Sequence, residues 1–365
     1  MKVFFDGRIF ALQQQGGISR LFFELMRSFG QTQQVEQILF RGVYADRYPF
    51  RKEWFKRYYG LRSPVARAIF LIKPLDDMGM ELAYRVNAAS GLIYHSTYYR
   101  LPRRVRGPVV VHTYDMIHEL YGGDLGTKML KKKALQRADL IISISESTKK
   151  DLCELHQIDP QKVVVAYPGV SSVFHKLTPR ISTVGNDDER PYMLYVGNRG
   201  WYKNFDLLLD TFIHKKYFCD FDLVLVGGEG RLSVPQQQVA ANSVGKPTWL
   251  RHEFRSDGGL AQLYSNATVF ICTSLYEGFG IPLVEAMACG CPVIAPRTSS
   301  VPEVVGDAAL LFDPKDPEDL GRQMDRFISD ESLRAGLVER GQLQVMRFSW
   351  DAMARAVYEA YLRIV

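Results

Sequence analysis

Short apolar runs alternate with longer stretches of helical periodicity along the whole chain of 365 residues. The predicted strands of the first half are Val3–Phe5, Gln37–Arg41, Leu92–His95, Val109–His112, Leu140–Ile144 and Lys162–Ala166. Those of the second half are Tyr192–Val196, Leu223–Val226, Thr248–Arg251, Val269–Cys272, Pro292–Ala295 and Ala309–Phe312. This alternation predicts parallel sheets wrapped by helices. Because the two series match in rhythm and the chain is too long for one core, we expect an α/β fold of two Rossmann-like domains.

A polar segment separates the two series of strands. Residues 178–191 (TPRISTVGNDDERP) carry charges and few large apolar side chains, which is typical of a linker. The sequence therefore predicts an N-terminal domain over 1–177 and a C-terminal domain over 192–349. A last helix is predicted over 350–365, and we expect it to pack back on the N-terminal domain.

The composition is that of an ordinary globular protein, with 47% hydrophobic and 24% charged residues. No run approaches the roughly 18 apolar residues that a membrane span needs. Charges at Lys2 and Asp6 interrupt any signal-peptide core, so we expect a cytoplasmic protein, with a position at the inner face of the membrane left open. The five cysteines have no disulfide or zinc spacing and are predicted to be buried thiols.

The net charge of +6 is concentrated in three basic clusters of the first half. One interleaves Arg51, Lys52, Lys56, Arg57, Arg62 and Arg67 with aromatic residues, and the others are Arg100, Arg103, Arg104 and Arg106, and Lys128 with Lys131–Lys133. Two interpretations stay open: solvated faces, or a surface for anionic lipid or a diphosphate-bearing acceptor, for which the basic and aromatic segment 50–67 is best suited. Nucleic acid is not expected as a partner, since no recognised motif accompanies the charge.

The most informative stretch is Ser274–Ala295 (SLYEGFGIPLVEAMACGCPVIA). A glycine-containing loop follows a strand, Pro282 stands where a helix begins, and Gly290 ends that helix. Such a strand–loop–helix unit presents a positive helix end to an anion, and Gly280 lets the backbone approach a phosphate.

Two carboxylates of this stretch are candidate ligands. Glu285 is expected in the first turn of the helix, where it suits hydrogen bonds to ribose hydroxyls, and Glu277 lies in the loop before it. From spacing alone, the alternatives are equally good: a solvated loop carboxylate for Glu277 and a helix-dipole interaction for Glu285.

The spacing of Glu277 and Glu285 within EGFGIPLVEAMACGCPVIA resembles the hallmark of glycosyltransferase family 4. The likeness extends over nearly the whole chain, through Ser145–Leu152, Tyr167–Val170, Tyr195–Gly197 with Lys203-Asn204, Val226–Gly228 and Ser299–Asp313. It implies a GT-B fold, a nucleotide diphosphate sugar as donor and retention of anomeric configuration.

The resemblance also implies roles for particular residues. Glu285 would hold the ribose, Glu277 would face the donor sugar, and the backbone around Phe279, Gly280, Ile281 and Pro282 would meet the sugar hydroxyls and distal phosphate. Lys203, after the loop with Gly197 and Asn198, would neutralise the leaving diphosphate. Relatives often carry a second basic residue beside that lysine, and here Arg199 is the candidate, because Tyr202 occupies the usual position.

The N-terminal half supplies candidates for the other side of the reaction. Gly16 and Gly17 form a glycine loop at a helix start, followed one turn later by Arg20, and the matching loop of GT-B enzymes faces the donor diphosphate and the acceptor. His112 and Asp115 lie at and after a strand end, where site residues of parallel sheets gather. Relatives place a histidine directly before the aspartate, whereas this chain has Tyr114 there, so Asp115 is the stronger candidate of the two.

The predicted function is transfer of a hexose from a nucleotide diphosphate sugar to a glycan or lipid-linked acceptor in bacterial surface-polysaccharide synthesis. A mannose- or rhamnose-type donor such as GDP-mannose is favoured by the resemblance. No cofactor and no protein-bound metal are expected. The alternatives are a degenerate scaffold protein and a sugar-nucleotide epimerase or hydrolase on the same fold.

Overall fold

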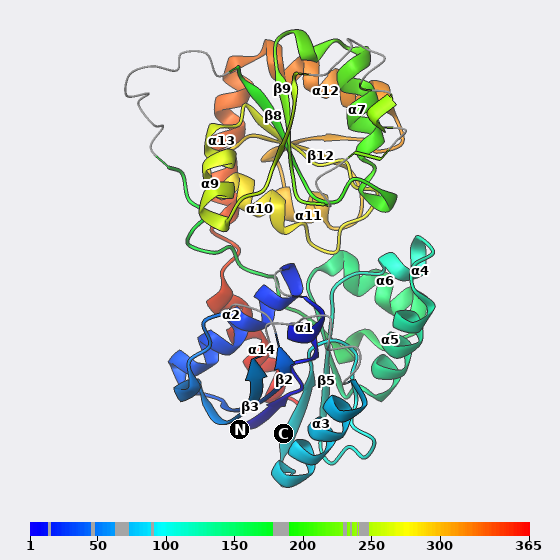
Figure 1. Ribbon diagram of the computed structural model, residues 1–365, viewed down its shortest axis with the longest axis vertical. Helices are drawn as coiled ribbons and strands as arrows, with labels where there is room; N and C mark the ends of the chain where they lie inside the picture. Colours follow the sequence, from blue (N-terminus) through cyan, green and yellow to red (C-terminus); the bar gives the residue numbers. More distant parts are fainter. Residues whose placement is uncertain are drawn as a thin grey trace. The chain divides into compact units, whose positions relative to one another are not determined.

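The computed structural model describes residues 1–13, 16–44, 48–62, 73–88, 91–177, 190–228, 232–233, 236–238, 240 and 248–365. The chain divides into two compact units, which we call unit 1 (Met1–Gly169 with Ser349–Val365) and unit 2 (Val170–Phe348). Figure 1 shows the two units, with both termini in unit 1. Most of the predicted linker, residues 178–189, lies outside the described residues.

Unit 1 is built on a seven-stranded parallel sheet of order β3-β2-β1-β4-β5-β6-β7. Its strands are β1 Lys2–Phe5, β2 Glu36–Tyr44, β3 Phe55–Arg62, β4 Leu92–Ser96, β5 Val109–Thr113, β6 Leu140–Ser143 and β7 Val163–Val165. The six strands predicted for the first half are confirmed. Most of their central residues are buried, as expected where helices cover both faces of a parallel sheet.

Strand β3 was missed, because the segment 50–67 reads as a basic and aromatic surface. Its described part is a 3-10 turn, η1 (Lys52–Trp54), followed by the edge strand β3. Edge strands commonly carry exposed charges, and Lys56 and Arg57 are exposed here. The aromatic residues turn inward: Phe50 packs on Phe10, Phe23 and Phe55.

Helices of unit 1 include the C-terminal one. They are α1 Arg8–Leu12, α2 Gly17–Thr32, α3 Lys73–Asn87, α4 Ile117–Leu120, α5 Leu125–Arg137, α6 Glu146–His156 and α14 Trp350–Tyr361, with the 3-10 turn η3 Pro160–Lys162. Helix α14 packs on α2, where Ser28 Oγ donates to Asp351 Oδ1 at 2.6 Å, and on β6 and β7 (Figure 1). Gly169 permits this return, since a Cβ there would lie 2.2 Å from the backbone nitrogen of Trp350.

Two histidines are buried between the sheet of unit 1 and α14. The ring of His95 contacts Tyr361 Oη through Nδ1 (2.5 Å) and His112 Nδ1 through Nε2 (2.8 Å). His112 is 1% exposed, and burial lowers its pKa to about 3. Burial first, and then the neighbouring ring, lowers the pKa of His95 well below its ordinary value. Both rings are therefore neutral in the folded chain at neutral pH.

We expect this pair to make the fold acid-sensitive. Below about pH 6.5 the unfolded chain binds protons that the folded chain excludes, so stability falls as the pH drops from 6.5 towards 3. For His112 alone the loss at pH 5 is about 2 kcal/mol. Urea unfolding between pH 7.5 and 5 measures it. His112→Asn, which keeps a polar atom near the Nδ1 position, should flatten the profile, and identical profiles for both proteins would refute the expectation.

Unit 2 repeats the same topology with six parallel strands in the order β10-β9-β8-β11-β12-β13. The strands are β8 Tyr192–Val196, β9 Asp222–Val226, β10 Leu250–Glu253, β11 Val269–Ile271, β12 Val293–Pro296 and β13 Ala309–Phe312. All six predicted strands are confirmed, with β10 shifted two residues towards the C-terminus. The two parallel α/β sheets together confirm the predicted fold class.

The helices of unit 2 surround that sheet. They are α7 Phe205–His214, α9 Asp257–Asn266, α10 Ile281–Ala288, α11 Val301–Val305, α12 Pro317–Ser329 and α13 Glu331–Val345, with the 3-10 turns η4 Trp201–Lys203 and η5 Tyr217–Cys219. Helix α7 packs against α12, and α10 packs against α9 and α13. Cys272, Cys289 and Cys291 are buried as predicted, Cys153 is partly exposed, and Cys219 is exposed, contrary to the prediction, because it lies in the surface turn η5.

Candidate functional site

The order of the strands identifies one edge of the unit 2 sheet as the place for a ligand. Strands β8 and β11 are neighbours, but the chain leaves them in opposite directions across the sheet, towards β9 and towards β12. In open parallel sheets, ligands bind beyond the carboxyl ends of the strands at this reversal point. The loop after β8 carries Gly197–Lys203, and the loop after β11 carries Glu277.

The structure brings Lys203 and Glu277 together at that point. Lys203 Nζ donates to Glu277 Oε1 at 2.7 Å, and the two side chains are 17% and 13% exposed. Two further hydrogen bonds join the loops: Leu275 N donates to Tyr202 O at 2.7 Å, and Thr273 Oγ1 donates to the carbonyl of Lys203 at 3.0 Å. The pair is therefore held in place by the backbone on both sides.

The pairing fixes the charge of the lysine. Burial, the largest single effect, lowers the pKa of the Lys203 ammonium, but Glu277, Tyr202 and Cys272 together outweigh it, so that pKa lies above its ordinary value. Lys203 is thus a permanent positive charge at the carboxyl ends of two strands, which is what a leaving diphosphate requires.

Three serines position Glu277, and sequence reasoning did not single them out. Ser274 Oγ donates to Glu277 Oε1 at 2.6 Å, Ser300 Oγ donates to the Glu277 carbonyl at 2.8 Å, and Ser299 Oγ accepts from the Glu277 N–H at 2.8 Å. Ser299 has a positive φ of 47°. The only available signal was the resemblance over Ser299–Asp313, which did not assign these contacts.

Helix α10 begins beside this pair. Gly280 is its N-cap with φ 88°, which favours glycine, and Pro282 occupies the first turn as predicted. Phe279 is buried and packs edge-on against Phe348. The helix ends in a Schellman motif, with Cys291 N donating to Ala286 O and Gly290 N to Met287 O, so the predicted glycine cap is confirmed.

Glu285 lies one turn further along than the sequence suggested. Helix α10 starts at Ile281, so Glu285 is in the second turn, and the first turn holds no acidic residue. Its side chain is 6% exposed, and Tyr264 Oη donates to its Oε2 at 3.4 Å. A nearly buried carboxylate on the inner face of a helix is costly unless it is bound, so a surface interaction with the helix dipole does not explain it.

Arg199 is the second candidate phosphate ligand in the loop after β8. Its Nη1 donates to the carbonyl of Gly227 at 2.8 Å, and the carbonyl of Arg199 accepts from Gln236 Nε2 at 3.0 Å. Gly197, at φ 148°, lies against the Lys203 stem, since a Cβ there would be 3.9 Å from Lys203 Cδ. Asn198 is held through its carbonyl by Tyr195 Oη at 2.5 Å. The structure places Arg199 in the same loop as Lys203, and its phosphate contact stays a prediction.

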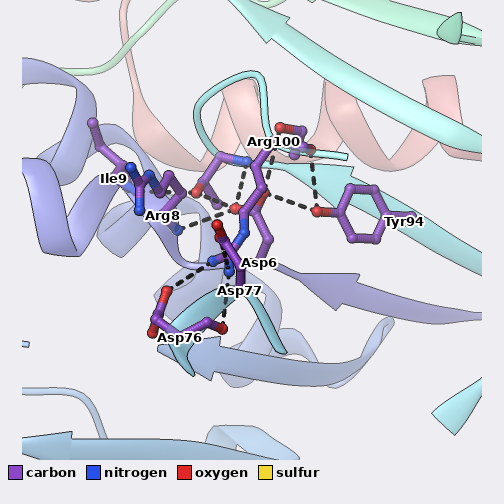
Figure 2. Close-up of polar contacts among 9 residues, drawn as sticks. Asp6, Arg8, Ile9, Asp76, Asp77, Tyr94 and Arg100 are labelled. Carbon is purple, nitrogen blue, oxygen red and sulfur yellow. Dashed lines mark hydrogen bonds and ion pairs between the residues drawn. The ribbon is translucent and has the colours of Figure 1, made fainter. Parts of the chain in front are cut away.

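The corresponding reversal point of unit 1 lies between β1 and β4. Asp6, directly after β1, accepts hydrogen bonds from the backbone of Arg8 and of Thr97 and from Tyr94 Oη. Figure 2 shows this cluster, together with Arg100 bound to Asp76 and Asp77. Asp6 thereby fixes the carboxyl ends of β1 and β4 relative to each other. The loop with Gly16 and Gly17 comes after α1, which directly follows Asp6 and Gly7.

The candidate site residues of unit 1 lie at the start of α2 and at the end of β5. Gly16 is the N-cap of α2 with Gly17 as its first residue, and the Arg20 N–H donates to the Gly16 carbonyl at 3.0 Å. Asp115 follows β5 and accepts from Ile117 N at 3.0 Å; burial raises its pKa, although Lys131 opposes the shift. His112 is buried inside unit 1 against His95, so its ring faces the interior rather than a substrate surface.

Within the ranges that the structure describes, no three His, Cys, Asp or Glu side chains are grouped so as to hold a metal ion. Among the described helices, none is long and apolar enough to cross a membrane.

Comparison with known proteins bears on both halves of the chain. Residues 15–173 match the family described as glycosyltransferase family 4, and residues 180–344 match glycosyl transferases group 1. The chain belongs to the family 4 glycosyltransferases. The predicted GT-B fold and family membership are thereby confirmed, and this glycosyltransferase takes its sugar from a nucleotide-sugar donor.

The chain is similar in sequence to a curated mannosyltransferase and similar in fold to two solved structures. The chain is 28% identical over 281 residues to the O-antigen chain mannosyltransferase B of Escherichia coli, covering 74% of each chain. Among solved structures, a sucrose-phosphate synthase from Thermosynechococcus elongatus has a TM-score of 0.77 at 18% identity, covering 100% of this chain and 98% of that one. The Anabaena protein HepE, solved with UDP-glucose, has a TM-score of 0.74 at 18% identity over 98% of both chains.

Proposed function

We propose that this glycosyltransferase transfers mannose from GDP-mannose, with retention of configuration, to a glycan or lipid-linked glycan in surface-polysaccharide synthesis on the cytoplasmic side of the membrane. The observation that carries the reaction is the Lys203–Glu277 pair at the carboxyl ends of β8 and β11 beside the start of α10. The sugar and the pathway are supported by the mannosyltransferase that shares 28% identity with the chain.

In this proposal the diphosphate lies between the start of α10 and the β8 loop. Lys203, Arg199 and the positive end of α10 take up the charge that develops as the bond from the anomeric carbon to the diphosphate oxygen breaks. Glu285 holds the ribose hydroxyls, and the backbone of Phe279, Gly280, Ile281 and Pro282 contacts the distal phosphate and sugar. These protein charges replace a metal ion, so turnover is expected to persist in EDTA.

Glu277 faces the sugar while holding Lys203. The acceptor hydroxyl oxygen bonds to the anomeric carbon on the face that the diphosphate leaves, and its proton passes to the departing phosphate oxygen. In this scheme the diphosphate and the acceptor are contacted by residues of unit 1, namely Gly16, Gly17, Arg20 and Asp115. His112, buried against His95, supports the β5 end rather than touching the substrate.

A nucleotide panel tests the donor. The thermal unfolding midpoint should rise with GDP and GDP-mannose in EDTA and remain unchanged with ADP and dTDP, since only a ligand of the native state stabilises it. UDP-glucose is the ligand of the Anabaena structure. If UDP and UDP-glucose raised the midpoint instead, the proposed donor would change in base and sugar, and the reaction class would stay the same. No shift with any nucleotide would favour a scaffold protein.

A transfer assay tests the chemistry. With GDP-mannose and octyl α-mannoside in EDTA, nuclear magnetic resonance should show an α-linked disaccharide that depends on both substrates. A β-linked product would contradict retention, and loss of turnover in EDTA that Mg²⁺ restores would contradict metal independence. Donor breakdown at the same rate without acceptor would indicate a hydrolase.

A further inference from the structure

Helix α3 of unit 1 exposes a continuous apolar stripe. Leu75, Met78, Leu82 and Val86 are 67%, 66%, 64% and 64% exposed, and their spacing of three and four residues places them on one face of the helix. A helix of a globular protein normally turns such a face towards the core. Other residues of α3, such as Met80 and Tyr84, are buried and pack in the core of unit 1.

Helix α5 extends this surface. Leu125, Met129 and Leu130 are 72%, 69% and 54% exposed. The two helices line one groove of ≈ 770 Å³, to which α3 contributes Met78 and Leu82 and α5 contributes Leu130. Met78, Leu82 and Leu130 therefore share one groove, which the rest of the α3 stripe continues, whereas Met129 lines a second groove with Leu155.

The same surface is basic. Arg85 of α3, Arg103 of the segment after β4, and Lys133 of α5 line the groove. Arg100 also lines the groove, but it is held in ion pairs with Asp76 and Asp77, and Lys131 is buried in an ion pair with Glu119. The carboxylates nearest the groove are Asp77, which pairs with Arg100, and Glu81, which pairs with Arg85.

We propose that this α3–α5 face, consisting of the apolar residues Leu75, Met78, Leu82, Val86 and Leu130 with Arg85, Arg103 and Lys133, docks on an anionic lipid bilayer. Long apolar side chains flanked by cations enter the interface between headgroups and acyl chains, and the cations bind anionic headgroups. A second copy of the chain is a poor occupant, because it would bring two basic surfaces together. This docking does not depend on the identity of the donor or acceptor.

Vesicle flotation with the full chain tests the proposal. The protein should float with phosphatidylcholine vesicles that contain phosphatidylglycerol, remain behind with phosphatidylcholine alone, and detach as salt screens the charges. Met78→Ser/Leu82→Ser/Leu130→Ser and, separately, Arg103→Glu/Lys133→Glu should each weaken binding roughly tenfold or more. All the changed side chains are exposed, and circular dichroism confirms that the variants fold.

Matched variants on unit 2 serve as controls. Leu343 and Met346 are 62% and 79% exposed, and Lys315 and Arg326 are also exposed. Leu343→Ser/Met346→Ser and Lys315→Glu/Arg326→Glu should bind vesicles as the wild type does. Equal binding by the folded α3–α5 variants and the controls would overturn the proposal. A concentration-dependent dimer that the apolar variant abolishes would overturn it too and assign the face to a second copy.

Discussion

Replacing Lys203 by methionine is expected to lower kcat about a thousandfold, because in the proposed mechanism the leaving diphosphate loses the positive charge of this side chain. The Nζ atom of Lys203 is held at the carboxyl ends of β8 and β11 by a 2.7 Å bond to Glu277. Steady-state kinetics with the donor identified by the nucleotide panel measure the change. An unchanged kcat in the folded variant would remove Lys203 from the mechanism.

The control for this variant separates catalysis from stability. Lys203→Met leaves the carboxylate of Glu277 buried without its partner, which costs roughly 3–5 kcal/mol. The double variant Lys203→Met/Glu277→Gln removes that charge as well and should recover most of the lost stability. Its turnover should stay low. If the double variant recovered turnover as well as stability, the lysine would be a structural partner of Glu277 only.

The second large effect is expected for Glu285→Ala, which should weaken nucleotide diphosphate binding roughly a hundredfold, since two charge-assisted hydrogen bonds to the ribose are lost. Titration calorimetry with the nucleotide alone measures binding independently of turnover. Tyr264→Phe is the matched control, because it removes only the hydroxyl that lies 3.4 Å from Glu285 Oε2. It should weaken binding less than tenfold, and wild-type affinity in Glu285→Ala would exclude the ribose contact.

Much of the fold could be predicted from the chain, because hydrophobic periodicity reports burial directly. Twelve of the thirteen described strands follow from buried apolar runs such as Val109–His112. Strand β3 escaped because an edge strand is half solvated: Lys56 and Arg57 interrupt the apolar pattern that defines a central strand. For the aromatic residues of the segment 50–67 the sequence leaves open a solvated face or a surface for lipid or acceptor, and the structure shows Phe50 and Phe55 packing inward.

The backbone conformation of the site could be predicted from the sequence, but its side-chain contacts could be predicted less well. The glycine, proline and Schellman positions around α10 follow from φ requirements, which leave a clear trace in the sequence. The Lys203–Glu277 pair spans 74 positions in sequence and depends on two loops converging from β8 and β11. Spacing cannot encode such a contact, and neither can it reveal that His112 points towards His95 rather than outward.

The serines that hold Glu277 illustrate the same limit. Ser274 is close to Glu277 in sequence, but Ser299 and Ser300 reach it from the segment after β12. Serine is common in loops, so its presence there carries little information until the loop conformation is known. The resemblance marked the segment as important without saying what it does.

Hydrogen–deuterium exchange with and without saturating nucleotide diphosphate locates the donor site on the chain. Protection on binding should be concentrated in peptides covering 197–204 and 274–285 of unit 2, and Glu285→Ala should reduce it at the same nucleotide concentration. Protection confined to unit 1, or no change in these two segments while the nucleotide is bound, would show that the donor binds elsewhere.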